Sequence, residues 1–267
     1  ECDLQLTADD VLVCLHDTTV DRTTGGASTG RVDSFTLEQL RAMDFGTWFG
    51  PSFSGARVFT LEEQIRCYRG ADPELQFYVE TKEPSEYGGR MEPLLVDLLR
   101  RLDLLPTGEP DVRTSPVIVQ SFDAGSLASI RQLAPSLPTA LLFNLPTPEI
   151  EQGQLPAVDV LVPNVVFLQP HPELIASAHA AGLEVHTWTV DDPALMATLI
   201  DQGIDGFFTN EPTIARTAVD AKGRSSGRTP QVLTTAGPDD TTPGPGCPAG
   251  MGIGIGNGNG NERTSTG

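Results

Sequence analysis

The chain has 267 residues, of which 39% are hydrophobic and 20% are charged, a composition typical of a folded protein with a substantial core. Acidic residues outnumber basic ones by 36 to 17, which gives a formal net charge of −19 and does not suit a protein that grips nucleic-acid phosphates. No apolar run reaches the roughly 18 residues that a membrane-spanning helix needs. We therefore expect no nucleic-acid partner and no integral membrane segment in this chain.

Short apolar runs recur along the first 210 residues. They are nearly continuous in hydrophobicity, which is typical of strands that are covered on both faces. The expected strands are ECDLQLT (1–7), VLVCLHD (11–17), LQFYVETK (75–82), SPVIVQSFD (115–123), PTALLFNL (138–145), VDVLVPN (158–164), LEVHTWTV (183–190) and IDGFFTN (204–210).

Most of the segments between these runs have the apolar spacing of amphipathic helices. Two of them begin with a capping box, which pairs Thr36 with Gln39 in one helix and Thr60 with Glu63 in the other. Further helical patterns occupy 87–105, 123–134, 171–182, 192–203 and 211–220.

The alternation of strands and helices predicts a parallel sheet with helical crossovers. Only three residues separate 1–7 from 11–17, so we expect the second strand to be the hairpin partner of the first. Seven core strands then remain, one fewer than a closed (β/α)₈ barrel needs. Glu80 has several strand residues ahead of it, whereas Glu1 begins its strand. The fold class that we expect is an α/β TIM barrel that lacks its first βα unit.

The composition changes near residue 222. Residues 223–267 are rich in Gly, Pro, Thr and Asn and have no hydrophobic periodicity, which is typical of disorder. We therefore expect a barrel domain over 1–222 followed by a disordered tail over 223–267.

Four cysteines occur, at positions 2, 14, 67 and 247, without the CxxC spacing of metal sites. Cys2 and Cys14 lie in the two arms of the expected hairpin, so one alternative is a disulfide between them. Cysteine usage leaves the redox compartment open.

Acidic residues stand at two strand ends. Glu1 and Asp3 are two residues apart, as are Glu80 and Lys82, so each pair points to one side of its strand. The carboxyl ends of barrel strands meet in one cleft. Three carboxylates gathered there would attract a hard divalent cation such as Mg²⁺ or Ca²⁺, and Lys82 suggests an anionic substrate. The alternative is a solvated acidic rim with a local ion pair between Glu80 and Lys82.

His16 ends the strand in VLVCLHDTTVDRTTGG, beside the expected acidic group. An imidazole there could transfer protons near neutral pH, although a turn residue is the alternative. Trp188 would offer an apolar wall to the cleft. His186 shares the strand face of Trp188 and is expected to pack inside the barrel, whereas the remaining two histidines, His171 and His179, are expected at the surface.

Taken together, these residues resemble the glycerophosphodiester phosphodiesterase family. The matching stretches follow the family's order over nearly all of 1–215, and they are ECDLQLTADDVLVCLHDTTVDRTTGG, LRAMDFGTWFGPSFSGARVFTLEEQ, FYVETK, VQSFD, TWTV and GIDGFFTNEP. The resemblance implies a TIM barrel that hydrolyses glycerophosphodiesters to glycerol 3-phosphate and an alcohol, a reaction of lipid and glycerol metabolism. It also implies the help of a divalent metal.

The resemblance implies roles for single residues as well. Glu1, Asp3 and Glu80 would be the metal ligands, and His16 one of two acid/base histidines. The substrate contacts would come from Lys82, which would touch the phosphate, and from Gln120 and Trp188. ETKEPSEYGG resembles a longer loop of extracytoplasmic members, which favours a location outside the cytoplasm.

One family motif is missing. No His-Arg-Gly tripeptide occurs in the chain, and its place in the family would be ahead of Glu1. The resemblance therefore implies an enzyme fragment whose own activity is impaired. Alternatives are a phospholipase D-like or phosphoinositide-type phosphodiesterase on the same barrel, or a non-catalytic phosphate-binding module. The head-group alcohol, the metal and the oligomeric state stay open.

Overall fold

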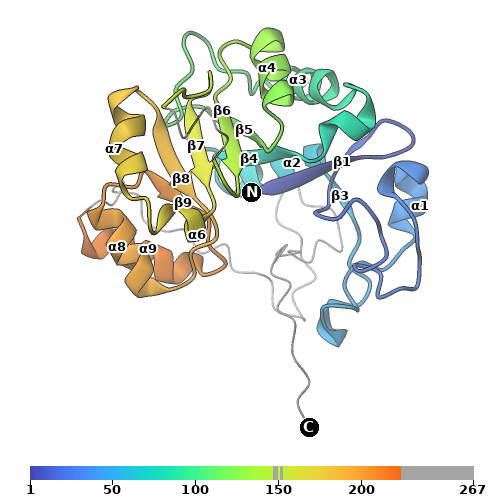
Figure 1. Ribbon diagram of the computed structural model, residues 1–267. Helices are drawn as coiled ribbons and strands as arrows, with labels where there is room; N and C mark the ends of the chain where they lie inside the picture. Colours follow the sequence, from blue (N-terminus) through green and yellow to red (C-terminus); the bar gives the residue numbers. More distant parts are fainter. Residues whose placement is uncertain (147–149, 151–152, 224–267) are drawn as a thin grey trace.

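The computed structural model describes residues 1–146, 150 and 153–223, shown as the coloured ribbon in Figure 1. The expected tail over 223–267 lies outside these residues, except for Gly223. Among the described helices, none combines the length and apolar character that a membrane crossing requires.

A nine-stranded sheet forms the centre of the molecule, in the order β3-β2-β1-β4-β5-β6-β7-β8-β9. Two strands are antiparallel additions: β2 (Leu12–Cys14) pairs with β1, and β3 (Phe59–Thr60) pairs with β2. This confirms the expected hairpin, whereas the two-residue β3 was too short to show a period in the sequence. The seven parallel strands are those expected: β1 (Cys2–Leu6), β4 (Phe77–Thr81), β5 (Val117–Ser121), β6 (Thr139–Phe143), β7 (Val160–Pro163), β8 (Glu184–Thr187) and β9 (Gly206–Phe207).

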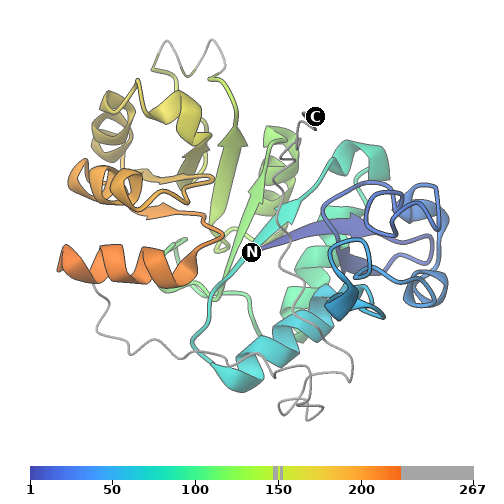
Figure 2. The same cartoon turned by 90° about the horizontal axis from the view of Figure 1, so that it is seen from below.

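Helices connect the parallel strands and lie outside them (Figures 1 and 2). They are α1 (Leu37–Arg41), α2 (Leu61–Ala71), α3 (Met91–Arg101), α4 (Ala124–Leu133), α6 (Val165–Leu168), α7 (Glu173–Ala180), α8 (Pro193–Asp201) and α9 (Pro212–Ala221). Both expected capping boxes are present, at the starts of α1 and α2. The single turn α6 was not expected, because its four apolar residues merely extend the apolar run of β7.

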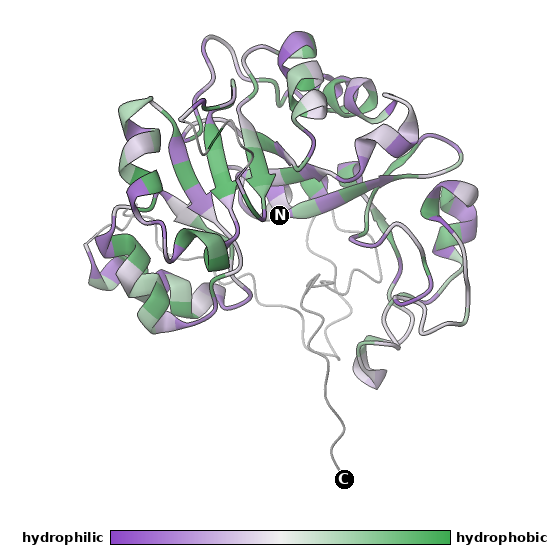
Figure 3. Ribbon diagram, viewed as in Figure 1, coloured by the Kyte–Doolittle hydropathy of each residue, from purple (hydrophilic) through white to green (hydrophobic). Residues whose placement is uncertain are grey.

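Two apolar layers hold the strands in place. The larger cluster joins residues of the strands to residues of the helices. The strands at the centre of the sheet are largely green, that is hydrophobic, in Figure 3. A smaller cluster fills the inner side of β5, β6 and β7 with Ile118, Ala140, Leu142, Val160 and Val162. The alternation of side chains along each strand therefore separates an outer, helix-covered face from an inner face.

The register of the strands brings polar side chains together on the inner face. Asp3 of β1 pairs with Glu80 of β4, and Glu80 pairs in turn with Gln120 of β5. Gln120 then pairs with Ala140, where the apolar part of the inner face begins. Because cross-strand partners project to the same side of a sheet, the three polar residues form one row beside the apolar cluster.

Candidate active site

The acidic residues expected at the strand ends lie together. Glu1, Asp3 and Glu80 each offer a carboxylate oxygen, and these oxygens all lie within 4.8 Å of one another. Lys82 is beside them, with Nζ 3.3 Å from Oδ1 of Asp3 and 3.5 Å from Oε1 of Glu80. The structure thus joins four of the expected site residues, from β1 and from the end of β4.

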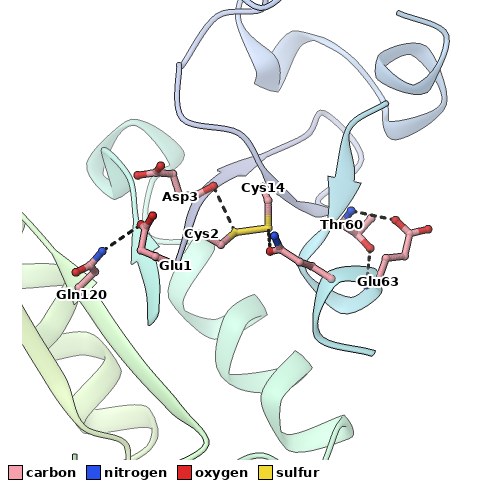
Figure 4. The surroundings of a disulfide bond; sticks show 8 residues. Glu1, Cys2, Asp3, Cys14, Thr60, Glu63 and Gln120 are labelled. Carbon is pink, nitrogen blue, oxygen red and sulfur yellow. Dashed lines mark hydrogen bonds between the residues drawn. A yellow bond between two sulfur atoms is a disulfide. The ribbon is translucent and has the colours of Figure 1, made fainter. Parts of the chain in front are cut away.

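Gln120 completes this group from the neighbouring strand β5. Its Nε2 donates a hydrogen bond of 3.2 Å to Oε1 of Glu1, and the two side chains point toward each other in Figure 4. Its Oε1 is buried and has no hydrogen-bond partner among the described residues. A buried acceptor without a partner lowers the stability of the fold. A ligand that bonded to this oxygen would remove that cost.

The environment disfavours the charged form of two of the carboxyls. Burial, followed by the negative charge of Asp3, raises the pKa of Glu80 to about 8. The same two causes, in the same order, raise the pKa of Glu1 to about 7. Burial alone would lower the pKa of Lys82, but the charges of Asp3 and Glu80 outweigh it and raise that pKa. Near neutral pH, Glu80 and Glu1 are therefore largely or partly protonated in the ion-free protein, whereas Lys82 keeps its positive charge.

The donor set fits a hard divalent cation. The three grouped ligand atoms are carboxylate oxygens, which is the chemistry that Mg²⁺ and Ca²⁺ select. Two like charges about 5 Å apart repel by roughly 3 kcal/mol at the effective dielectric of a half-buried site. A divalent ion would remove this repulsion, so Glu1, Asp3 and Glu80 together form a group that can hold a metal.

A disulfide ties the strand of the acidic group to the strand that leads to His16. Cys2 lies between Glu1 and Asp3 in the sequence and is bonded to Cys14, with Cα atoms 5.7 Å apart (Figure 4). The disulfide alternative is thereby confirmed. The backbone N–H of Leu15 donates to the carbonyl oxygen of Asp3 at 2.9 Å, which holds the two segments together beyond the disulfide.

His16 has an exposed side chain that bonds to its neighbour in sequence. Its Nδ1 lies 2.8 Å from Oδ1 of Asp17, and among the described residues none of its recorded bonds reaches the acidic group. Arg22 donates two hydrogen bonds to the same carboxylate, of 2.7 and 2.8 Å. Burial alone would raise the pKa of Asp17, but the hydrogen bonds from Arg22 and His16 outweigh it and lower that pKa. An ionised Asp17 can only accept, so Nδ1 of His16 is the donor and Nε2 remains available.

The sequence analysis assigned no role to Asp17 or Arg22. The signal was in the quoted stretch, where an acid follows the histidine directly and an arginine comes five residues after that acid. Nothing in the spacing alone says that these side chains turn toward one another.

Trp188 lies at the end of β8, and its indole Nε1 donates to the carbonyl oxygen of Val162 at 3.1 Å. Its ring meets the ring of Phe122 edge to face, with centroids 5.6 Å apart. Phe122 follows Gln120 by two residues and is 45% exposed. Phe122 was not expected at the site, although it stands two residues after Gln120, the spacing of a single strand face. An aromatic pair therefore joins the end of β5 to the end of β8.

The other histidines lie where the sequence placed them. His186 is buried inside the barrel and shares a hydrogen bond of 2.7 Å with the hydroxyl of Tyr78. His171 and His179 are exposed, and each pairs with an acidic residue at the surface.

Comparisons with known proteins agree with this arrangement. Residues 1–214 match the sequence model of the Glycerophosphoryl diester phosphodiesterase family. Probable glycerophosphodiester phosphodiesterase 1 of Mycobacterium tuberculosis is 32% identical over 236 residues, which cover 86% of this chain and 84% of that protein. The glycerophosphodiester phosphodiesterase of Bacillus subtilis is 33% identical over 228 residues, which cover 80% of this chain and 74% of that protein.

A solved structure confirms the fold class. The phosphodiesterase of Oleispira antarctica, in complex with the product sn-glycerol-3-phosphate, superposes with a TM-score of 0.69 at 23% identity, over 82% of this chain and 83% of that chain. The TIM barrel expected from the sequence is thus the fold of this chain. With the family match spanning residues 1–214, the chain belongs to the glycerophosphoryl diester phosphodiesterase family.

Proposed function

We propose that this protein hydrolyses glycerophosphodiesters to glycerol 3-phosphate and an alcohol, with Mg²⁺ or Ca²⁺ held by Glu1, Asp3 and Glu80. The observation that carries the proposal is the convergence of three carboxylates and one ammonium at one edge of the barrel. Family membership supports the reaction class, and the product in the Oleispira antarctica structure supports glycerol 3-phosphate as one of the products.

The acidic group of Glu1, Asp3 and Glu80 lets the site bind a phosphodiester through a cation. A cation bound there supplies positive charge to the phosphoryl oxygens of the substrate. Lys82 adds a compact positive charge that is already within 3.5 Å of two of the carboxylates, and it contacts the phosphate. Gln120 lies beside Glu1 and Trp188 packs against Phe122, and we assign Gln120 and Trp188 to contacts with the rest of the substrate.

His16 serves as the proton donor to the leaving alcohol. Its Nδ1–H is held by Asp17, so in the imidazolium form the proton that it transfers is the one on Nε2. As the attacking water oxygen bonds to phosphorus and the bond between phosphorus and the departing oxygen breaks, that proton moves to the departing oxygen. The alcohol leaves neutral, the imidazole is left neutral with its proton on Nδ1, and the proton of the attacking water passes to solvent. The reverse role, in which Nε2 takes a proton from the attacking group, uses the same geometry. A positioned acid or base contributes about 10² to 10⁴ in rate.

The disulfide supports a location outside the cytoplasm. Disulfides persist in oxidising compartments and are rare where thiols are kept reduced. Cys2 and Cys14 are bonded here. Together with the loop that resembles extracytoplasmic relatives, this favours an extracytoplasmic enzyme. We also propose that residues 1–222 belong to the catalytic barrel domain and that this domain ends near residue 222, since the family match ends at residue 214 and α9 ends at Ala221.

The proposal is tested by the release of glycerol 3-phosphate from glycerophosphocholine. The protein is expressed from its complete reading frame, so that all residues that the gene encodes are present. Lysophosphatidylcholine and phosphatidylinositol are assayed in parallel, because phospholipase D-like and phosphoinositide-type enzymes would prefer these acylated substrates. We expect His16→Ala to lose about 10²-fold or more of the wild-type kcat. The matched control His171→Ala changes an exposed histidine and keeps the wild-type rate. Wild-type turnover by His16→Ala would show the role of His16 to be wrong.

A further inference from the structure

We propose that Asp17, Arg22 and Trp48 form an orienting chain that holds the imidazole of His16 in its reactive direction. The three residues are positioning residues, since none of them needs to touch the substrate. The inference rests on the role proposed for His16 and adds residues to it that neither the sequence nor the family match assigns.

The first link is the contact between Asp17 and His16. A carboxylate that accepts from one ring nitrogen fixes both the tautomer and the direction of the ring. Oδ1 of Asp17 is 2.8 Å from Nδ1 of His16, which directs the opposite edge of the ring away from Asp17. The side chain of His16 is 43% exposed, so packing alone does not hold it.

The second link is the fork of Arg22 on Asp17. Nε of Arg22 donates to Oδ2 at 2.7 Å and Nη2 donates to Oδ1 at 2.8 Å. Two parallel bonds fix the plane of a carboxylate, which a single ammonium cannot do. Arg22 is 46% exposed, and an exposed ion pair contributes little to overall stability. The fork is therefore better explained by the orientation of Asp17 than by the stability of the fold.

The third link is the indole of Trp48, which lies under the guanidinium of Arg22. The Cζ atom of Arg22 is 4.6 Å from the ring centroid, within the range of a cation–π contact. Trp48 is 38% exposed and belongs to none of the hydrophobic clusters of the described residues. Trp48 also meets the ring of Phe49 edge to face, with centroids 5.7 Å apart, and its ring face is the surface on which the guanidinium of Arg22 lies.

The loop that carries Trp48 is built to hold it still. The carboxylate of Asp44 accepts hydrogen bonds from the backbone N–H groups of Gly46, Thr47 and Gly55. The indole Nε1 of Trp48 donates to the carbonyl oxygen of Phe45 at 2.9 Å. A Cβ at Gly46 would meet the carbonyl oxygen of Phe53 at 1.8 Å, so the two sides of the loop are in direct contact. Because the loop is held in one conformation, the indole of Trp48 is a rigid surface against which the guanidinium of Arg22 packs.

The orienting chain has a kinetic signature that a stabilising role lacks. A variant that weakens the contacts of the orienting chain should lower kcat on the same substrates as His16→Ala does, but by a smaller factor. If His16 protonates the leaving alcohol, its loss matters for glycerophosphocholine and matters much less for the p-nitrophenyl ester of glycerol 3-phosphate. The nitrophenolate leaves without a proton, so this second substrate bypasses a general acid.

The test compares kcat and KM for these two substrates in a set of variants of the protein expressed from its complete reading frame. For Arg22→Gln we expect kcat on glycerophosphocholine to fall by about 10 to 100-fold, the usual effect of misplacing a catalytic group. KM should stay within about twofold of wild type. Asp17→Asn should show the same pattern. Trp48→Leu should show a smaller loss, which Trp48→Phe restores because phenylalanine keeps an aromatic face.

Two controls separate this inference from the proposed function and from a fold defect. Arg66→Gln removes an exposed arginine that forms an ion pair on α2 and should keep wild-type kinetics. In the His16→Ala background, Arg22→Gln should cause no further loss, since residues that act as one unit are not additive. Wild-type activity of His16→Ala would contradict the proposed function itself. If His16→Ala is impaired, two results would overturn the orienting chain. One is that Arg22→Gln loses activity equally on both substrates while His16→Ala does not. The other is that adding Arg22→Gln to His16→Ala lowers the activity further.

Discussion

Asp3 and Glu80 are direct cross-strand partners in β1 and β4, and their carboxylates share the ammonium of Lys82 at 3.3 and 3.5 Å. The lysine is thus a resident cation of the acidic group. A divalent ion that binds there must overcome the repulsion from the ammonium of Lys82. The same ammonium is in place to attract the phosphate of a substrate.

Removing the charge of Lys82 should separate metal binding from substrate binding. In Lys82→Met the repulsion between ammonium and bound ion is gone, so we expect affinity for Mg²⁺ or Ca²⁺ to rise by about tenfold. KM for glycerophosphocholine should rise by at least about tenfold, because a phosphate contact is lost. Calorimetry and steady-state kinetics measure the two effects. Lys222→Met is the matched control, since this other lysine pairs with Asp201 at the surface and should change neither value.

The stability of the ion-free protein should fall as the pH rises. The pKa values of Glu1 and Glu80, about 7 and about 8, both lie above their ordinary value of 4.5. A group whose pKa is raised on folding contributes stability that is complete below its unfolded pKa and is lost as the pH rises through its folded pKa. With EDTA present, we expect Tm to decrease between pH 5 and about 8.5, and added Mg²⁺ or Ca²⁺ to reverse the decrease. Glu80→Gln should flatten the pH dependence, and an unchanged slope in that variant would count against the assignment.

Gln120 should contribute to metal affinity through its buried oxygen. Gln120→Leu removes this acceptor and the hydrogen bond to Glu1. Loss of such support around a metal site costs about 10 to 100-fold in affinity, which calorimetry measures directly. Gln202→Leu changes a glutamine that is exposed at the end of α8 and should leave the affinity unchanged.

The disulfide should stabilise the hairpin that joins the acidic group to His16. Cys2 and Cys14 are 12 residues apart. A cross-link that closes a loop of this length contributes about 2 to 3 kcal/mol to the free energy of unfolding. We expect the double variant Cys2→Ser with Cys14→Ser to lose about that much in denaturant titrations. A loss of less than about 0.5 kcal/mol would show that the hairpin needs no cross-link.

Most of the fold could be predicted because its signals are local and periodic. Apolar runs marked seven parallel strands, and the two capping boxes marked the starts of α1 and α2. The acidic group could also be predicted, because strand geometry forces Asp3 and Glu80 to the same edge of the barrel. The two-residue β3 and the single turn α6 could not, since elements so short have no period.

The side-chain contacts around His16 could not be predicted from the sequence, for a different reason. They depend on the path of the loop after β2, which brings Arg22 back to Asp17, and on a separate loop that places Trp48 under Arg22. Neither path follows from a repeating pattern. Phe122 was overlooked in the same way, because only the structure shows its edge against Trp188.

The most direct test of the central claim, a hydrolase whose metal is held by the acidic group, is the rate of glycerol 3-phosphate release during a cation titration. The protein is stripped with EDTA, and Mg²⁺ or Ca²⁺ is then added to wild type, to Glu80→Gln and to the surface control Glu62→Gln, which alters an exposed ion pair on α2. We expect the stripped wild type and Glu62→Gln to be inactive and to recover with the cation, and Glu80→Gln to need about 10 to 100-fold more cation. A full rate in EDTA, or recovery of Glu80→Gln at the wild-type cation concentration, would contradict the account.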